Sequence, residues 1–340
     1  MHWSIQPAFE RDRRGPEDTL PHAVHVDLLE LLKLEFKATG FSLLPRQPVH
    51  SLLAGRRASR LRGRGLNFEE IRRYLPGDDV RNMDWRVTAR TGKPHVRAYS
   101  EERDRPCLLI VDQRQSMFFG SRRVMKSVAA AEVAALAAWR VFHTGDRVGA
   151  IVFNDTDIVA VPPLRSRQRV MDILGTIRTF NHALKPAGQV DRSNPAMLQQ
   201  ALDQALRLAK HDYLVCLISD GAGYDAACKD KVAQLLAHND VLAALIYDPL
   251  EAALPDVSRR LVMSTAAAQL EVDLADHRLR QGFAADFQAR LTSITEAARQ
   301  RSIPLLPIAT DEDVATQIRR LLGAALRQTS SRATSRRSIK

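Results

Sequence analysis

The sequence is poor in three features that mark particular classes of protein. It contains only 3 cysteines in 340 residues, and Cys107, Cys216 and Cys228 lack the spacing of a metal site. No stretch longer than ten residues is free of Asp, Glu, Lys and Arg, which excludes a membrane-spanning helix. The N-terminus lacks the basic start and apolar run of a signal peptide. These absences predict a cytoplasmic protein with reduced thiols, and the 45% of hydrophobic residues suits a sizeable core.

Positive charge is concentrated in two segments. The net charge is +11, with 14 Arg and 1 Lys against 8 acids in residues 46–105, and 5 basic residues and no acids in residues 327–340. Such segments suit nucleic acid or an anionic membrane surface. In 46–105, however, arginines alternate with carboxylates, which favours internal ion pairs. The final segment is rich in Ser, Thr and Arg without apolar periodicity, which is typical of a disordered tail.

Apolar runs alternate with helix-forming stretches from residue 107 onward. Strands are predicted at 107–112, 147–153, 213–219, 240–247 and 303–308, and helices at 122–143, 165–179, 195–210, 226–238 and 282–300, with a last helix opening at Thr310. Continuous apolar strands separated by helices predict an α/β fold with a mostly parallel sheet and helices on both faces. Residues 268–274 alternate like an edge strand, which indicates a short inserted hairpin.

Two aspartates, Asp112 and Asp220, stand at the carboxyl ends of predicted strands. In open parallel sheets, ligands bind at this edge near the topological switch point. If the two strands are neighbours, these carboxylates and Ser116 form an oxygen-ligand set suited to Mg²⁺. The alternative is that the strand-end aspartates only cap the turns that follow them.

A longer pattern of residues resembles a known family. It comprises GRGLNFEEIRRYLPGDDVRNMDWRVTARTG (63–92), EER (101–103) and VDxxxSM (111–117), and it continues through MKS (125–127), GDRVG (145–149), SDG (219–221) and YDPLE (247–251). These residues are similar to the DUF58 family, which comprises bacterial proteins with a von Willebrand factor A-like domain, often encoded beside a MoxR-type AAA+ ATPase. The resemblance covers roughly residues 25–325. The chain resembles the shorter members of the family, which lack N-terminal membrane helices.

This resemblance implies a von Willebrand A fold with a metal-ion-dependent adhesion site, whose pattern is Asp-x-Ser-x-Ser with a later Thr and a later Asp. Asp112, Ser116 and Asp220 match, Arg114 replaces the first serine, and Ala196 stands at the threonine unless Ser193 serves in a shifted register. A guanidinium has only donors and a fixed positive charge, so it cannot bind a cation. We therefore expect no metal or other cofactor, and an Arg114 that bridges the two aspartates. Mg²⁺ held by Asp112, Ser116 and Asp220 is the alternative.

Other residues lack the spacing of a catalytic set. The sequence has no phosphate-binding G-x-x-x-x-G-K-[ST], and its histidines lack H-E-x-x-H spacing. Asp78 and Asp79 directly follow Pro76-Gly77, which favours turn and ion-pair roles over acid–base chemistry. Asp155 and Asp157 resemble half of a calcium loop, but the downstream glycine and glutamate are missing, which favours a hairpin turn.

The signature within 46–105 is predicted to have a structural role, with charged side chains that pair with one another around one tryptophan. Its residues are Glu69, Arg72, Arg73, Asp78, Asp79, Arg81, Asp84, Trp85, Arg86 and Arg90. The predicted organisation is an N-terminal arm (1–24), a helix within 25–45 followed by a small Arg- and Gly-rich signature subdomain (together 25–105), the von Willebrand A-like domain (106–326) and a basic tail (327–340).

The sequence favours a protein that binds other proteins over an enzyme. The resemblance implies a non-enzymatic adaptor that works with a MoxR-type AAA+ ATPase in the assembly or remodelling of a client protein. Two alternatives from other classes stay open. One is a metal-dependent phosphoester hydrolase that uses Asp112, Asp220 and the basic segment 46–105. The other is a nucleic-acid-binding protein that uses 46–105 and the tail.

Overall fold

The structure is a computed structural model that describes residues 4–6, 24–39, 41, 43, 66–76, 78, 80–101, 105–185, 194–252, 260–264, 269–273 and 277–322. Contacts divide the chain into two units, 1–47 with 105–340 and 48–104. The tail 327–340, most of the arm 1–24, Asp79 and Ser193 lie outside the described residues, as does the side chain of Glu69. Among the helices of the described ranges, none is long and apolar enough to cross a membrane.

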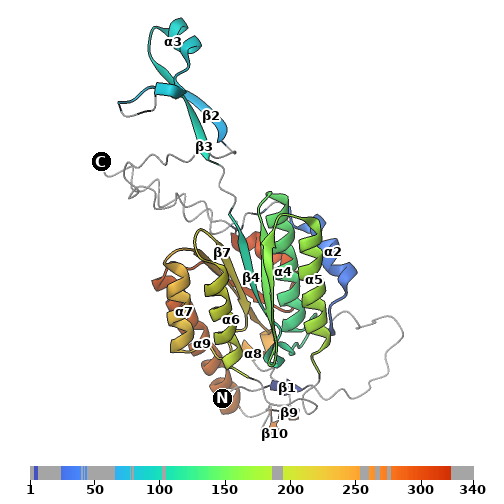
Figure 1. The fold of residues 1–340 in the computed structure, drawn as a ribbon. Coiled ribbons are helices and arrows are strands. Elements are labelled where there is room, and N and C mark those ends of the chain that lie inside the picture. The colour runs from blue at the N-terminus through green and yellow to red at the C-terminus, as the bar shows by residue number, and fades with distance from the viewer. Residues whose placement is uncertain are drawn as a thin grey trace. The chain divides into compact units, whose positions relative to one another are not determined.

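A six-stranded sheet forms the centre of the larger unit (Figure 1). In spatial order its strands are β11 (Leu305–Ala309), β8 (Asp240–Tyr247), β7 (Leu214–Ser219), β4 (Cys107–Asp112), β5 (Val148–Phe153) and β6 (Ile158–Leu164). Neighbouring strands are parallel except β5 and β6, which are antiparallel. The predicted mostly parallel α/β sheet is therefore confirmed, and the strands that end in Asp112 and before Asp220 are neighbours.

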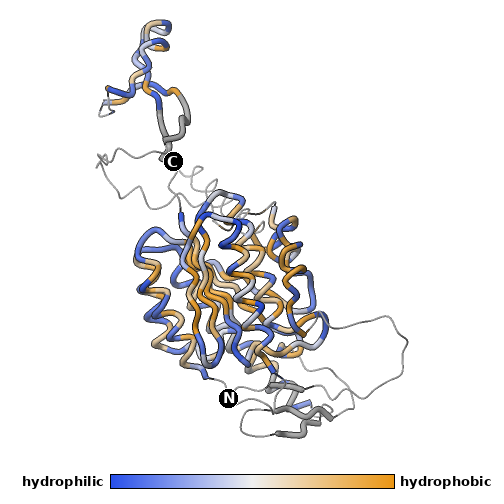
Figure 2. Tube along the Cα trace, turned by 45° about the vertical axis from the view of Figure 1, so that its right-hand side comes forward, coloured by the Kyte–Doolittle hydropathy of each residue, from blue (hydrophilic) through white to orange (hydrophobic). Residues whose placement is uncertain are grey.

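Helices cover both faces of this sheet because its strands are apolar on both sides. In β4, Cys107, Leu109 and Val111 belong to one hydrophobic cluster, whereas Leu108 and Ile110 belong to the other. The first cluster includes α2 (Leu28–Lys37), α4 (Lys126–His143), α5 (Arg167–His182) and the helix 314–322, and the second includes α6 (Ala196–Leu208) and α7 (Ala226–Leu236). Helix α9 (His277–Gln300) lies on the side of α6 and α7. Figure 2 shows hydrophobic residues concentrated along the strands.

A short hairpin is inserted before α9, as residues 268–274 indicated. It consists of β9 (Arg260–Ser264) and β10 (Gln269–Asp273), which pair in antiparallel register. Strand β1 (Ser4–Gln6) adds to the outer side of β9. The sequence gives no sign of this third strand, because three residues are too few to show a periodicity.

The smaller unit is built on an antiparallel pair, β2 (Leu66–Arg73) and β3 (His95–Glu101). Between them lie the short 3-10 turn η1 (Val80–Asn82) and the helix α3 (Trp85–Thr91). Asp84 caps the start of α3 by accepting the N–H groups of Arg86 and Val87, both at 3.1 Å. Gly92 ends the helix in the left-handed region (φ 68°), a conformation that glycine adopts without the penalty of a side chain.

Candidate functional site

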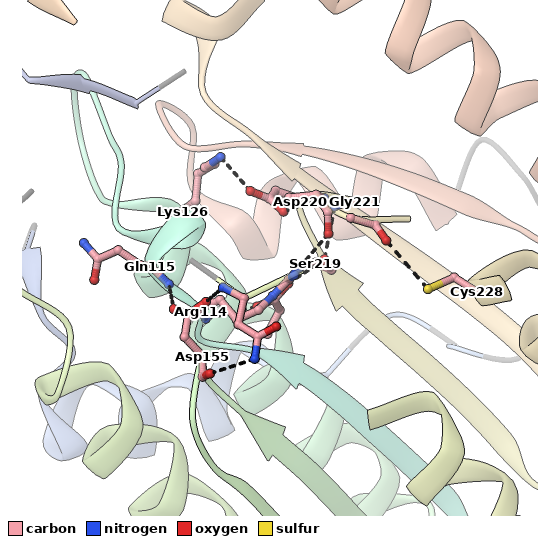
Figure 3. A network of polar contacts seen from close by, with 12 residues as sticks. Arg114, Gln115, Lys126, Asp155, Ser219, Asp220, Gly221 and Cys228 are labelled. Atoms are coloured by element: carbon pink, nitrogen blue, oxygen red, sulfur yellow. Dashed lines mark hydrogen bonds and ion pairs between the residues drawn. The ribbon is translucent and has the colours of Figure 1, made fainter. Parts of the chain in front are cut away.

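The loop after β4 begins with a close contact between an aspartate and an arginine. Asp112 Oδ1 accepts hydrogen bonds from the backbone N–H and the Nε–H of Arg114, both at 3.0 Å. Arg114 Nη2 donates to Asp112 Oδ2 (2.6 Å) and to the carbonyl oxygen of Ala222 (2.9 Å). The arginine therefore folds back onto the end of its own strand, where its side chain is 1% exposed (Figure 3).

All the acceptor positions of the Asp112 carboxylate are in use. The parallel register of β4 and β7 brings Ser219 alongside, and its hydroxyl donates to Asp112 Oδ2 at 2.7 Å. An ionised carboxylate offers about four lone-pair positions. Three donors of Arg114 and the one from Ser219 match them in number. Asp112 is thus fully hydrogen-bonded by the protein itself, as a buried charge requires.

A second buried cation lies at the same edge of the sheet. Lys126 is the first residue of α4, and its Nζ donates to Asp220 Oδ2 (2.9 Å) and to Glu251 Oε1 (2.8 Å). Asp220 Oδ1 also accepts from the backbone N–H of Ala222 (2.9 Å). We expected one arginine to hold both aspartates, but a lysine that the sequence analysis did not assign holds Asp220. We call Asp112, Arg114, Lys126, Asp220 and Glu251 the two-cation site.

Both cations of this site remain protonated. Burial acts to lower the pKa of Arg114, but the adjacent Asp112 outweighs it, and the pKa of Arg114 is raised above its usual value. Burial likewise acts to lower the pKa of Lys126, and the two carboxylates Asp220 and Glu251 raise it above its usual value. The two-cation site therefore contains fixed positive charges that neighbouring carboxylates compensate.

Asp155 connects three loops around the two-cation site. It follows β5, and its two carboxylate oxygens accept the backbone N–H of Gln115 (2.6 Å) and that of Asn194 (2.7 Å). The first N–H belongs to the loop after β4, and the second to the segment before α6. The hairpin turn predicted for this segment is present, with Asn154 Oδ1 accepting the N–H of Thr156 and of Asp157. The turn interpretation did not reveal that Asp155 ties the neighbouring loops together.

The residues of the two-cation site do not fit a divalent cation. The Asp112 carboxylate has no lone pair left over, and Asp220 already holds an ammonium group. A unit positive charge 4 Å away would repel each unit charge of the ion by about 4 kcal/mol at an effective dielectric of 20. Ala196, the first residue of α6, has no side-chain oxygen. Ser116 Oγ, which is buried and has no hydrogen-bond partner in the structure, is the one oxygen that suits a metal.

Within the described ranges, no group of three or more His, Cys, Asp or Glu residues is arranged to hold a metal ion. The thiols of Cys107, Cys216 and Cys228 are buried, and burial raises the pKa of Cys228 to about 11. The charged groups of the site bind one another. The arrangement is therefore suited to holding loops in a fixed shape.

The signature of the smaller unit contains fewer internal ion pairs than its composition indicated. Arg72 and Asp78 form the expected kind of pair, with two hydrogen bonds of 2.8 Å. Asp84 pairs with Arg97 (2.8 Å), which was not among the expected partners. Arg81 does have an interaction partner. Glu69 and Asp79 cannot be assigned partners, because the side chain of one and the whole of the other lie outside the described residues.

For four signature residues, the structure differs from the structural role that the sequence predicted. Arg73, Arg86 and Arg90 were expected in ion pairs, but they are exposed and form none with any residue that the structure describes. Arg86 contributes its backbone N–H, not its guanidinium, to Asp84. Trp85 is 68% exposed, although it was expected within the packed signature. Trp85, Arg86 and Arg90 lie on the outer, exposed side of α3, and Arg73 is the last residue of β2, where it is exposed as well.

The residues that the sequence analysis missed share one property, which is a partner far away in the chain. Lys126 meets Asp220 over a separation of 94 residues. One signal was present, since this lysine opens the apolar, alanine-rich run 128–131, where a charge without a local partner indicates a buried ion pair. Glu251 and Asp155 gave no comparable signal, because Glu251 lies in the short helix α8 (Pro249–Ala252) and Asp155 follows a strand as ordinary loop residues do.

Comparison with known proteins assigns the chain to a family. The family model described as "Protein of unknown function DUF58" matches residues 70–292. Uncharacterized protein Rv1480 of Mycobacterium tuberculosis (strain H37Rv) and Uncharacterized protein Mb1516 of Mycobacterium bovis are each 31% identical over 295 residues, which cover 87% of this chain and 90% of theirs. The chain belongs to the DUF58 family, as its signature residues predicted.

Two solved structures are similar to this chain at low identity. The conserved hypothetical protein BatB from Bacteroides thetaiotaomicron is 14% identical, with a TM-score of 0.37, and the match covers 66% of this chain and 99% of that one. The SpRpn10 VWA domain is 11% identical, with a TM-score of 0.32 and coverages of 63% and 93%. At TM-scores this low, the likeness says nothing about the function of this chain.

Proposed function

We propose that this member of the DUF58 family is a non-enzymatic adaptor. Its partner docks at the carboxyl edge of the six-stranded sheet, over the loops that the two-cation site holds together. The observation that carries the proposal is the burial of Arg114 and Lys126 at this edge, each against a carboxylate. The protein thereby supplies by its own side chains the positive charge that would otherwise come from an ion.

The buried ion pairs support the binding of a partner because they leave only the loops of this edge at the surface. Their charges are paired internally, so they offer neither an open coordination position nor a free acid or base. The groups that remain for a partner are the loops themselves, at η2 (Gln115–Met117) and at the start of α6 and α7. Loops positioned by a rigid sheet are a common place for recognition.

The partner that the family resemblance implies is a MoxR-type AAA+ ATPase, with a client protein that the two act on together. In this arrangement the adaptor binds the ATPase in one nucleotide state more tightly than in the other. Binding would take place in the cytoplasm, in keeping with the absence of a membrane-spanning helix from the described residues.

One observation favours a second candidate, the metal-dependent phosphoester hydrolase. The buried hydroxyl of Ser116 has no hydrogen-bond partner in the structure, as expected of an oxygen that awaits a metal. Against it stand the two cations and the saturated Asp112 carboxylate. Hydrolysis of a generic phosphoester in the presence of Mg²⁺ or Mn²⁺, lost on substitution of Asp112, would favour this candidate.

The test of the adaptor proposal uses two exposed alanines at opposite edges of the sheet. Ala196 begins α6 at the carboxyl edge, and Ala237 ends α7 at the amino edge. The full chain is titrated with the purified MoxR-type ATPase of the same organism, with ATP and with ADP. We expect nucleotide-dependent binding that Ala196→Arg weakens at least tenfold and Ala237→Arg leaves unchanged, with equal melting temperatures. Absence of binding with either nucleotide, or equal effects of the two variants, would overturn the proposal.

A further inference from the structure

The outer face of α3 is a continuous stripe of exposed residues. At 3.6 residues per turn, Trp85, Arg86, Ala89 and Arg90 fall on one side of the helix, and all four are exposed. Val87 and Thr88 lie on the other side and are partly buried, and the Thr88 hydroxyl accepts the backbone N–H of His95 in β3 (3.0 Å). The inner side therefore attaches the helix to the strand pair, and the outer side makes no contribution to that attachment.

The exposure of Trp85 is unusual for a unit of this size. Among the residues of the smaller unit whose burial the structure describes (71–76, 78 and 80–97), Val96 is the one apolar side chain that is fully buried, at 3% exposed. Leu75 and Val80 are 60% and 58% exposed, and Trp85 is 68% exposed. A small unit gains stability by burying large apolar side chains such as that of tryptophan. An exposed tryptophan on a rigid helix indicates a surface for another molecule.

The charges on this stripe are free to act on a ligand. The carboxylates of Asp78 and Asp84 are already paired with Arg72 and Arg97. Arg86 and Arg90, one turn apart, are exposed and form no ion pair within the part of the chain that the structure describes. Two guanidinium groups that form no ion pair with a described residue therefore lie on the same exposed side of the helix as the indole ring.

We propose that this stripe, Trp85, Arg86, Ala89 and Arg90, binds an acidic segment of a protein partner that carries an apolar or aromatic side chain. The acidic groups would pair with the two arginines, and the apolar side chain would cover the indole beside the small Ala89. Tryptophan and arginine are the residues most enriched among those that dominate binding energy at protein interfaces. Charge complementarity adds specificity and a faster association.

A protein segment fits these residues better than nucleic acid does. Nucleic-acid binding draws on many phosphate contacts along a basic surface. Here the cations of the stripe number two, and they accompany exposed apolar side chains that have no use against a phosphate backbone. The stripe belongs to the smaller unit, whereas the two-cation site belongs to the larger one, so this inference does not depend on the proposed adaptor edge.

The experiment uses a library of random 12-residue peptides selected on the full-length protein. Two variants remove the stripe, Trp85→Ala and the double variant Arg86→Glu with Arg90→Glu. The matched control reverses two exposed arginines of the larger unit, Arg178→Glu with Arg207→Glu. We expect enriched peptides with net negative charge and at least one large apolar residue. Their affinity should fall at least tenfold in both stripe variants and less than twofold in the control, with unchanged circular dichroism.

Other outcomes would overturn the inference. These are neutral or basic selected peptides, peptides that bind the stripe variants as well as the wild type, and no enrichment over the stripe variants. Tighter, Trp85-dependent binding of a 20-nucleotide single-stranded or duplex DNA at 150 mM salt would assign the stripe to nucleic acid instead. A dimer in sedimentation that Trp85→Ala dissociates would assign it to a second copy of the chain. If the ATPase still binds while the peptides fail, the proposed function stands and this inference falls.

Discussion

Replacing Arg114 with serine removes one charge from the two-cation site and leaves its partner behind. Asp112 is 0% exposed, and three of its four hydrogen bonds come from Arg114. Loss of one member of a buried ion pair costs about 3–5 kcal/mol, because the remaining charge is uncompensated. For a unit of this size, each kcal/mol shifts the melting temperature by roughly 2–4 °C, so we expect a fall of about 6–20 °C.

The assays are thermal unfolding followed by circular dichroism and urea unfolding followed by tryptophan fluorescence, to which the buried Trp139 contributes. Arg122→Ser is the matched control, because Arg122 is 70% exposed and its ion pair with Asp311 is worth at most about 1 kcal/mol.

Magnesium distinguishes this explanation from a simple loss of packing. Calorimetric titration of the wild type with Mg²⁺ and Mn²⁺ should show no heat of specific binding. Arg114→Ser combined with Ala196→Thr should gain measurable affinity and recover part of the lost stability on addition of Mg²⁺. Micromolar, one-to-one binding of either ion to the wild type would refute the reasoning, and so would an Arg114→Ser variant as stable as the control.

Further expectations concern other charged groups and one thiol. Lys126→Met should lower the free energy of unfolding by about 3–5 kcal/mol, because two carboxylates lose their cation, as measured by urea unfolding. In thermal melts, Asp84→Ala should cost about 1 kcal/mol as a lost helix cap, whereas Arg86→Ala should cost less than about 0.5 kcal/mol. Burial acts to raise the pKa of Asp313, but its lysine partner outweighs burial and lowers this pKa to about 2. The wild type should therefore be more stable than Asp313→Asn by about 1 kcal/mol after solvent screening. This difference should hold above pH ~4 and vanish as the pH falls through about 2. With a pKa of about 11, roughly one Cys228 thiol in a thousand is ionised at pH 8, so alkylation should be far slower than after unfolding.

Contacts within a few residues were predictable from the sequence, and contacts between distant elements were not. Apolar runs located five of the six strands of the central sheet, because burial on both faces leaves a continuous hydrophobic signal, whereas the mostly unburied β6 gave none. The contact of Arg114 with Asp112 spans two residues, so chemistry and chain geometry together indicated it. The ion pair of Lys126 with Asp220 depends on which strand neighbours which, and composition does not encode that order.

The smaller unit shows the same limit at shorter range. Its alternating charges correctly indicated an ion pair for Arg72, whose partner Asp78 lies six residues away. They did not indicate Arg97, which reaches the carboxylate of Asp84 from β3, whereas Arg86 lies on the outer side of α3. Charge composition states how many pairs are available, but the direction of each side chain decides which of them form.

Asp155 has a consequence for the thermodynamics of any partner at the sheet edge. Its carboxylate holds the backbone of Gln115 and of Asn194, so the loops after β4 and before α6 are joined before anything binds. Ordering flexible loops on association costs conformational entropy, and a surface that is already fixed avoids this cost. Binding of a partner at this edge should therefore cause little change in loop conformation between the free and the bound protein.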